Sequence, residues 1–339
     1  MEFVSVSQQM MQAAWYEKQG KAKDVIEHGE MPIFTPKAGE VLVKIHVSGV
    51  NPSDTKTRSG WGGAGMSFPR VIPHNDGAGI IERVGEGVNN TRIGERVWLY
   101  ETQKGRAFGT AAEYAVVPSS QAITLPNNTS FAEGACLGVP AMTAHRAVFA
   151  DGSVEGKTVL VTGGAGAVGN YAISLAKWGG AKVFTTVSRP QQAEVAKTAG
   201  ADEIINYKSE DVVQRIEELT GERSIDRIID VNFTANLPVT NAVLKPNGVI
   251  VSYSSANPDD RPELPFLSMQ LINTTIRLIL VYTMPEEAKQ QAAKDITEAL
   301  KASALHHNIA RSFSLNEVAE AHEAQDSGEM IGKAVVEIA

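Results

Sequence analysis

The chain has 339 residues, too many for one ordinary core, which indicates two domains, and its apolar (43%) and charged (21%) fractions are typical of a globular protein. The net charge is −8 and the sequence contains no basic tract, which together disfavour a nucleic-acid partner. No apolar run reaches the roughly 18 residues of a membrane span. We therefore expect a soluble, cytoplasmic protein with no membrane partner and no nucleic-acid partner.

The first third of the chain is typical of a β-rich domain. The segment Glu40–Val50 alternates apolar and polar residues, as a half-buried strand does. Further short strands are expected at Gly77–Val88, Gly94–Tyr100 and Ala111–Pro118, between Gly, Pro and Asn turns. Short strands at this spacing predict a barrel-like domain. The first ten residues are interpreted as a leader that is not a signal peptide.

From about Gly138 the pattern changes to strands that alternate with helices. Strands are expected at Val159–Thr162, Lys182–Val187, Glu203–Asn206, Arg227–Val231, Gly248–Ser252 and Arg277–Tyr282. A long helix is expected over residues 285–304, ahead of a last strand at 333–339. This order of strands and helices predicts a doubly wound parallel sheet.

The first of these strands enters the segment GAGAVG at residues 164–169, which matches G-x-G-x-x-G. Because the segment follows an apolar strand and opens a helix, it predicts a dinucleotide-binding turn, with a plain strand-to-helix turn as the alternative. The first glycine is expected to permit the tight turn, the second to let a pyrophosphate approach, and the third to let helix and strand pack closely. Backbone N–H groups at the helix start would then bind the phosphates. The candidate cofactor residues are Gly164, Gly166, Ala167, Val168 and Gly169.

The next strand ends in Ser188-Arg189, where NAD-binding chains usually carry an acidic residue that binds the ribose 2′-hydroxyl. No Asp or Glu occurs between Asn170 and Ala193. A carboxylate would repel the 2′-phosphate of NADPH, whereas Arg189 can bind it through a charge-assisted hydrogen bond. The expected cofactor is therefore NADPH, bound at Ser188 and Arg189. A solvated surface charge is the alternative role of Arg189.

Short motifs in a fixed order extend over nearly the whole chain. They include VSGVNPSDTKTRSG (Val47–Gly60), DGAGIIERVGEGV (Asp76–Val88), LGVPAMTAHRAV (Leu137–Val148), LKPNGVIVSY (Leu244–Tyr253) and the stretch Phe313–Ile338. In these motifs the chain resembles the zinc-independent quinone oxidoreductases of the medium-chain dehydrogenase/reductase superfamily, the group that contains zeta-crystallin. The resemblance implies an α/β fold: a Rossmann doubly wound parallel sheet at residues 136–283 and a GroES-like, β-barrel-type catalytic domain formed by residues 1–135 and 284–339. It also implies a homodimer or homotetramer.

Zinc-dependent members of the superfamily bind a catalytic zinc through two cysteines and a histidine, and a structural zinc through four cysteines. The corresponding catalytic positions hold Asn51, Asn75 and a residue near Val139, and Cys136 is the single cysteine. Amides and an apolar side chain do not replace thiolate and imidazole ligands, so no metal is expected. We interpret Cys136 as a small buried residue.

A site without a Lewis acid is poorly suited to ionise an alcohol, which disfavours ordinary alcohol dehydrogenation. Hydride addition to a conjugated acceptor remains feasible, because the carbonyl oxygen that gains charge needs only hydrogen-bond donors. We expect an NADPH-dependent oxidoreductase whose small-molecule substrate is a quinone or an α,β-unsaturated carbonyl compound (an enone or enal). The alternative is a non-enzymatic protein that binds NADPH or RNA on the same scaffold.

The resemblance assigns three residues to catalysis. Asn51 would lie at the floor of the substrate cleft and donate to a developing oxyanion, or would only stabilise the Asn-Pro turn. Lys56 stands where relatives often have tyrosine, and would donate a charged hydrogen bond or point into solvent. Thr143 matches a position that contacts the nicotinamide ring, with a helix-start hydroxyl as the alternative.

Further candidate cofactor residues are Tyr207, Tyr253, Ser254, Ser255, Leu280, Tyr282 and Lys333. Ser254 and Ser255 follow the fifth strand, and ligands of such sheets lie beyond the carboxyl ends of the strands. Tyr207, Leu280 and Tyr282 resemble positions that bind the cofactor in relatives, with a core aromatic as the alternative for Tyr207. Tyr207 would reach the 2′-phosphate region, and Lys333 would face the cofactor cleft. The lysine that relatives carry two or three residues beyond Ser188 is replaced here by Gln191-Gln192, which leaves more of the phosphate charge to Arg189.

Overall fold

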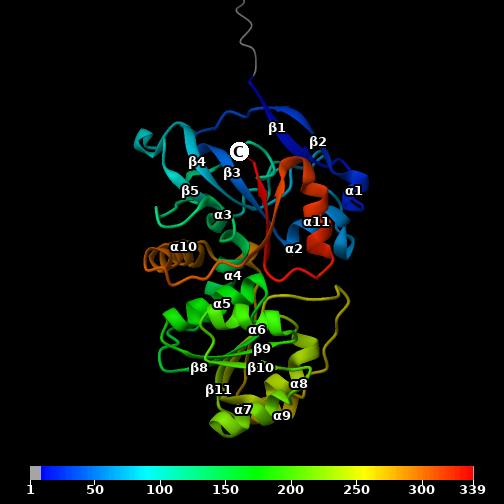
Figure 1. Cartoon of the computed structure of the whole chain (residues 1–339), viewed down its shortest axis with the longest axis vertical. Coiled ribbons are helices and arrows are strands. Elements are labelled where there is room, and N and C mark those ends of the chain that lie inside the picture. Colours follow the sequence, from blue (N-terminus) through cyan, green and yellow to red (C-terminus); the bar gives the residue numbers. More distant parts are fainter. Residues whose placement is uncertain (1–8, 339) are drawn as a thin grey trace, which may run out of the picture. The chain divides into compact units, whose positions relative to one another are not determined.

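The structure is a computed structural model that describes residues 9–338, so the predicted leader lies almost entirely outside the described residues (Figure 1). The chain divides into two compact units. The first unit comprises the described residues up to Val139 and those from Ile309 onward, and the second unit runs from Pro140 to Asn308.

The boundary near the C-terminus differs from the sequence prediction, which placed residues 284–308 with the two chain ends. In the structure this segment, with helix α10 (Glu286–Lys301), belongs to the second unit. Two contacts account for the difference. Asp295 Oδ2 lies 2.8 Å from His145 Nε2, and Asn170 Nδ2 donates to the carbonyl oxygen of His306 at 2.6 Å. Residues 136–139, predicted in the second unit, belong to the first.

The first unit is built on antiparallel strands. β1 (Met10–Trp15) pairs with β2 (Glu27–Pro32). The larger sheet has the order β14-β15-β3-β4-β5-β7, with β6 also paired to β3. Its strands are β3 (Glu40–Val50), β4 (Asp76–Val84), β5 (Arg96–Leu99), β6 (Tyr114–Pro118), β7 (Ala122–Thr124), β14 (Ile309–Ser314) and β15 (Lys333–Glu337). β15 therefore lies between β14 and β3, which joins the two ends of the chain in one sheet.

Alternate residues of β3 fill the core of this sheet. Val41, Val43 and Ile45 are buried in one cluster with Ile81 of β4 and Val97 of β5, which is the apolar pattern that predicted the strand. The helices of the first unit are α1 (Ala22–Val25), α2 (Pro52–Ser59), α3 (Phe131–Gly134) and α11 (Val318–Asp326). Helix α4 (Gly138–Phe149) begins in the first unit and continues into the second.

The second unit is a parallel sheet with the order β10-β9-β8-β11-β12-β13. Its strands are β8 (Thr158–Thr162), β9 (Lys182–Val187), β10 (Glu203–Asn206), β11 (Ile225–Asp230), β12 (Leu244–Ser252) and β13 (Thr275–Leu278). The helices that connect them are α5 (Ala167–Trp178), α6 (Pro190–Thr198), α7 (Val212–Thr220), α8 (Phe233–Val243) and α9 (Phe266–Leu271). Figure 1 shows α5 and α6 on one face of the sheet and α7 and α8 on the other, so the predicted doubly wound arrangement is confirmed. No described helix has both the length and the apolar character needed to cross a bilayer.

One predicted strand is wrong in its second half. The apolar run from Arg277 to Tyr282 was expected to form a single strand, but β13 ends at Leu278 and residues 281–283 form a turn of 3₁₀ helix. The N–H and the hydroxyl of Thr283 both donate to the carbonyl oxygen of Leu280, at 3.0 and 3.1 Å. These bonds curl the backbone away from the sheet, a turn that an apolar run does not reveal.

Candidate functional site

The glycine loop connects β8 to α5 at the carboxyl edge of the parallel sheet. Gly163 has a φ of 68°, so the left-handed residue of the tight turn is Gly163 and not Gly164, as the sequence analysis expected. A Cβ on Gly164 would lie 2.0 Å from Thr185 Oγ1, so Gly164 serves the packing of the loop against β9. A Cβ on Gly169 would lie 2.4 Å from the carbonyl oxygen of Gly163, so this glycine lets the helix approach the loop.

Gly166 has a different environment from the other glycines of the loop. A Cβ there would meet only the carbonyl oxygen of Gly163, at an ordinary contact distance of 3.4 Å. Gly166 is also the N-cap of α5, and no side chain caps the helix. Because glycine has no side chain, the N-cap residue cannot accept hydrogen bonds from the first-turn N–H groups, such as those of Ala167 and Val168. These N–H groups are therefore suited to bind an anion. The loop fits a pyrophosphate.

The glycine loop follows β8, the strand at which the strand order of the sheet reverses. β8 lies between β9 and β11, and the strands that follow β8 in the chain run outward from it on both sides. Because all strands of the sheet are parallel, the segments after β9, β10 and β12 open onto the same edge as the loop. Dinucleotides bind at such a switch point in doubly wound sheets.

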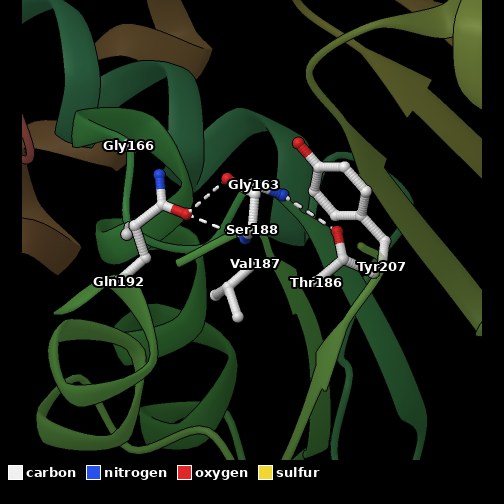
Figure 2. Close-up of a pocket in the computed structure, with 8 residues that line it drawn as sticks. Gly163, Gly166, Thr186, Val187, Ser188, Gln192 and Tyr207 are labelled. Carbon is white, nitrogen blue, oxygen red and sulfur yellow. Dashed lines mark hydrogen bonds between the residues drawn. The ribbon is translucent and has the colours of Figure 1, made fainter. Parts of the chain in front are cut away.

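A pocket lies at this edge, on the side of β9 and β10. It is lined by Gly163, Ala165, Gly166, Thr186, Val187, Ser188, Gln192 and Tyr207. Figure 2 shows Gln192 and Ser188 on one side and the ring of Tyr207 on the other. The backbone N–H of Gly163 donates to Thr186 Oγ1 at 3.2 Å, which ties the loop to the end of β9. The pocket thus brings together three predicted cofactor residues, Gly166, Ser188 and Tyr207.

Gln192 is a pocket residue that the sequence analysis noted only as a missing lysine. Its Oε1 accepts from the N–H of Ser188 at 2.8 Å and from Ser188 Oγ at 2.9 Å. Arg189 does not line the pocket; it is the exposed N-cap of α6. The sequence did contain a signal for this contact, because Ser188 and Gln192 are four residues apart at the start of a helix and such side chains lie close together.

The remaining predicted cofactor residues of the second unit lie on the opposite side of β8. They are Tyr253, Ser254 and Ser255 after β12, and Leu280 and Tyr282 beyond the end of β13. Tyr253 is half-buried, and Ser254 and Ser255 are exposed, with Ser255 Oγ donating to the carbonyl oxygen of Asn257 at 2.6 Å. None of the five lines the pocket in Figure 2. Thr143 lies in the second turn of α4 and is buried, so it is not a helix-start hydroxyl.

In the first unit, Asn51 belongs to a buried polar cluster. Its Nδ2 donates to Asp76 Oδ2 at 2.8 Å, and its Oδ1 accepts from the ammonium group of Lys333. Lys333 Nζ also lies 3.2 Å from Asp76 Oδ2, and the other carboxylate oxygen accepts from the N–H of Val139 at 2.8 Å. Lys333, predicted to face the cofactor cleft, is only 3% exposed and is instead held by Asn51 and Asp76.

A second carboxylate completes this cluster. Asp54 accepts from the N–H of Asn51 at 2.8 Å and from Asn75 Nδ2 at 3.1 Å. Burial, and then the nearby charge of Asp76, raise the pKa of Asp54 to about 7. Burial also raises the pKa of Asp76, while Lys333 and Asn51 oppose that effect. Neither aspartate was assigned a role from the sequence, although Asp76 directly follows Asn75 and Asp54 closes the turn that begins at Asn51.

Lys56 lies on α2, as Asp54 does, but its side chain points neither into this cluster nor freely into solvent. Its Nζ lies 4.2 Å from the centroid of the Trp61 ring, and the side chain is half-buried, which lowers the pKa of its ammonium group. The helix ends at Gly60, whose φ is 75°, and this turn brings Trp61 back over Lys56.

The donor set around Asn51 is not that of a metal site. Within residues 9–338, no group of three or more His, Cys, Asp or Glu side chains is arranged to hold a metal ion. The cation beside Asn51 and Asp76 is the ammonium group of Lys333.

Comparison with known proteins assigns the chain to a family. The description "Alcohol dehydrogenase GroES-like domain" matches residues 37–127, and "Zinc-binding dehydrogenase" matches residues 167–298. The quinone oxidoreductase of Sus scrofa is 30% identical over 321 residues, which cover 94% of this chain and 95% of the relative. A mycobacterial protein complexed with NADPH has a TM-score of 0.81 at 25% identity, covering 96% of this chain and 99% of its own.

The quinone oxidoreductase of Escherichia coli complexed with NADPH has the same fold, with a TM-score of 0.82 at 24% identity over 96% of this chain and 99% of its own. The GroES-like match falls on the β-rich first unit, and the second match falls on the parallel sheet. The chain therefore belongs to the quinone oxidoreductase family of the medium-chain dehydrogenase/reductase superfamily, and it is an oxidoreductase.

Proposed function

We propose that the protein is an NADPH-dependent reductase that transfers hydride to quinones or to α,β-unsaturated carbonyl compounds. The glycine loop is the observation that carries this proposal. At Gly166 the uncapped start of α5 adjoins open space, and the neighbouring strand end at Ser188 carries no carboxylate. These features suit a pyrophosphate and a ribose 2′-phosphate. The NADPH complexes of the mycobacterial and Escherichia coli proteins support the choice of cofactor.

When bound, NADPH supplies the hydride. The acceptor then gains negative charge on a carbonyl oxygen, and the chain has to supply donors to that oxygen. Lys56 is the proposed charged donor. Asn51 is the proposed neutral donor, because one N–H of its amide remains after the other donates to Asp76.

We propose that this chemistry needs no metal. The amide oxygens of Asn51 and Asn75 are the only atoms of these side chains that could coordinate a cation, and they already accept hydrogen bonds from Lys333 Nζ and from the N–H of Gln103. The ammonium group of Lys333 already neutralises Asp76 and would repel a metal ion. Activity should therefore survive exhaustive dialysis against EDTA, and zinc-dependent recovery after such dialysis would overturn this part of the proposal.

The proposed function is tested by following NADPH and NADH consumption with a panel of quinones and a panel of enones and enals. NADPH oxidation with at least one panel is expected, and Gly166→Val is the control that should remove it. The comparison of panels decides between the two substrate classes. RNA binding measured across a salt series tests the non-enzymatic alternative. Tight, salt-dependent RNA binding without NADPH oxidation would contradict the proposal.

We also propose a homodimer or homotetramer. β13 is an edge strand of the parallel sheet, and Leu278 on it is 74% exposed. Exposed apolar side chains continue nearby in the chain at Phe266, Leu267, Leu271 and Leu280. An apolar, unpaired sheet edge is a surface that a second copy can extend. Leu278→Lys should shift the sedimentation coefficient towards the monomer. Ile93→Lys, a change at another exposed apolar residue that lies in the first unit, should not.

A further inference from the structure

The orientation of the Gln192 amide is determined by its neighbours. The backbone N–H of Ser188 can only donate, so the side-chain atom 2.8 Å from it must be the amide oxygen. Ser188 Oγ lies 2.9 Å from the same oxygen, and therefore its hydroxyl hydrogen points there as well. The amide nitrogen is directed away from Ser188, and Figure 2 shows it turned towards the segment of Gly166.

This arrangement decides what each side chain can offer to a ligand. Within the described part of the chain, the amide nitrogen of Gln192 has no protein acceptor, so both of its N–H groups are available to a ligand. Ser188 has committed its only hydroxyl hydrogen, and its Oγ retains lone pairs alone. On this side the pocket presents donors from Gln192 and an acceptor from Ser188.

A ribose 2′-phosphate carries acceptors only, so it is satisfied by the amide nitrogen and not by Ser188. A ribose 2′-hydroxyl can both accept from the amide nitrogen and donate to Ser188 Oγ. No lining residue carries a carboxylate that would repel the phosphate. The pocket therefore admits both kinds of ribose, and any preference for the phosphate depends on the donors of Gln192.

The position of Gln192 on its helix keeps these donors in place. It is the third residue of α6, whose first residue is Pro190 and whose N-cap is Arg189. Two hydrogen bonds to Ser188 hold its amide across the turn between β9 and α6. The donors are thus preorganised, in contrast to the exposed side chain of Arg189.

We propose that Gln192 is the residue that recognises the 2′ substituent of the cofactor ribose, with its amide nitrogen donating to the 2′-phosphate. The proposal rests on the proposed function, namely that this edge of the sheet binds NADPH. It assigns the main discrimination to Gln192, whereas the sequence alone suggested Arg189.

The test is calorimetric binding of two fragments, 2′,5′-ADP and 5′-AMP, which differ only in the 2′-phosphate. Gln192→Glu keeps an oxygen acceptor for Ser188 but replaces the donor group by a charged acceptor. Gln191→Glu is the matched control, since it introduces the same charge one residue earlier at an exposed position. Circular dichroism melting of each variant reports folding independently of any ligand.

Gln192→Glu should weaken 2′,5′-ADP binding by roughly 10- to 100-fold, the range expected when a hydrogen bond to a charged group is lost. Binding of 5′-AMP should change by less than about threefold, because a hydroxyl can donate to the new carboxylate. Gln191→Glu should change both fragments by less than Gln192→Glu changes 2′,5′-ADP. Gln192→Ala, which adds no charge, should also lose selectivity for 2′,5′-ADP over 5′-AMP.

Equal weakening by Gln192→Glu and Gln191→Glu would overturn the inference, because it would show that charge alone is responsible. Unchanged selectivity in Gln192→Ala would overturn it as well. Failure of the wild-type protein to bind either fragment would instead contradict the proposed function. The two kinds of failure are therefore distinguished by the wild-type measurement.

Discussion

The ammonium group of Lys333, at the start of β15, donates a hydrogen bond to the amide oxygen of Asn51, which directly follows β3, although the two residues are 282 positions apart. Lys333 Nζ also lies 3.2 Å from Asp76 Oδ2, and the same carboxylate oxygen accepts a hydrogen bond from Asn51 Nδ2. The three side chains form a closed triangle. Its charge balance and the orientation of the Asn51 amide both depend on Lys333.

Replacing Lys333 by methionine should destabilise the protein by about 3–5 kcal/mol, because Asp76 would keep a buried charge without its partner. Urea unfolding measures this loss. The double variant Lys333→Met, Asp76→Asn removes both charges and should recover part of it. Equal losses in the single and double variants would show that the two residues do not act as a pair.

Asp54 should make the stability of the first unit depend on pH. The pKa of this carboxyl is raised from its ordinary value of 3.8 to about 7 in the folded state, so the folded state holds an extra proton between these values. Its stabilising contribution is therefore complete below about pH 4 and is lost as pH rises to about 7, at up to ~1.4 kcal/mol per pH unit. Asp54→Asn resembles the protonated form and should lack this slope.

The measurement for Asp54 is urea unfolding of both proteins at intervals from pH 4.5 to 8. The difference in unfolding free energy should grow in favour of Asp54→Asn until about pH 7 and then level. Parallel curves across the whole range would place the titration elsewhere.

Gly166→Val should abolish NADPH binding and leave the fold intact. Its Cβ would touch the protein only at 3.4 Å, so the branched side chain would occupy ligand space. Gly169→Val is the contrasting variant, because its Cβ would lie 2.4 Å from a backbone oxygen and should destabilise the unit itself. Calorimetry with NADPH and thermal melting separate the two effects. Unchanged NADPH affinity in folded Gly166→Val would refute the assignment of the loop.

Arg189→Ala should weaken NADPH binding and leave NADH nearly unchanged. A charge-assisted bond to the 2′-phosphate contributes about 1.5–3 kcal/mol, or roughly 10- to 100-fold in affinity. Because Arg189 is exposed and does not line the pocket, we expect the lower end of this range. Titrations with both cofactors check it, and equal weakening of the two would make Arg189 a structural residue.

Lys56→Met should lower kcat and kcat/KM together if the lysine donates to the acceptor in the transition state. The loss should be greater for enones than for quinones, because an enolate is more basic than a hydroquinone anion. Replacing Asn51 should weaken transition-state binding less, since a neutral amide donates the weaker bond. Steady-state kinetics on one quinone and one enone decide this. If Lys56→Met keeps the wild-type rates, the lysine has no part in catalysis and only packs against Trp61.

Much of the fold was predictable because apolar alternation and the strand–helix rhythm are local properties. The bounds expected for β3, β9 and β10 agree with the structure. The strand at Arg277–Tyr282 was not predictable beyond Leu278, because the turn that ends it is closed by Thr283, just beyond the apolar run. The position of residues 284–308 was missed for a similar reason. It depends on side-chain contacts such as that between His145 and Asp295, which no local pattern encodes.

The candidate site was predictable where spacing carries the chemistry and not where distant segments meet. The glycine loop is local, although the left-handed role belongs to Gly163, one residue before the motif. The pairing of Lys333 with Asn51 requires β15 and β3 to be neighbours, which only the sheet topology reveals. Gln192 was overlooked because a glutamine in place of a lysine was interpreted as the loss of a charge, whereas its amide is held in place by two hydrogen bonds from Ser188.

The position of β15 between β14 and β3 has a consequence for how the chain is made. β15 pairs with β3, so the first unit cannot complete its sheet until β15 has left the ribosome, after all of residues 140–308. Until then β3 is not paired with β15 along Val47–Val50, and the ammonium group of Lys333 is not beside Asp76. The second unit, whose strands are contiguous in sequence, can fold first during synthesis. A nascent chain arrested before Lys333 would thus present a finished second unit and an incomplete first unit.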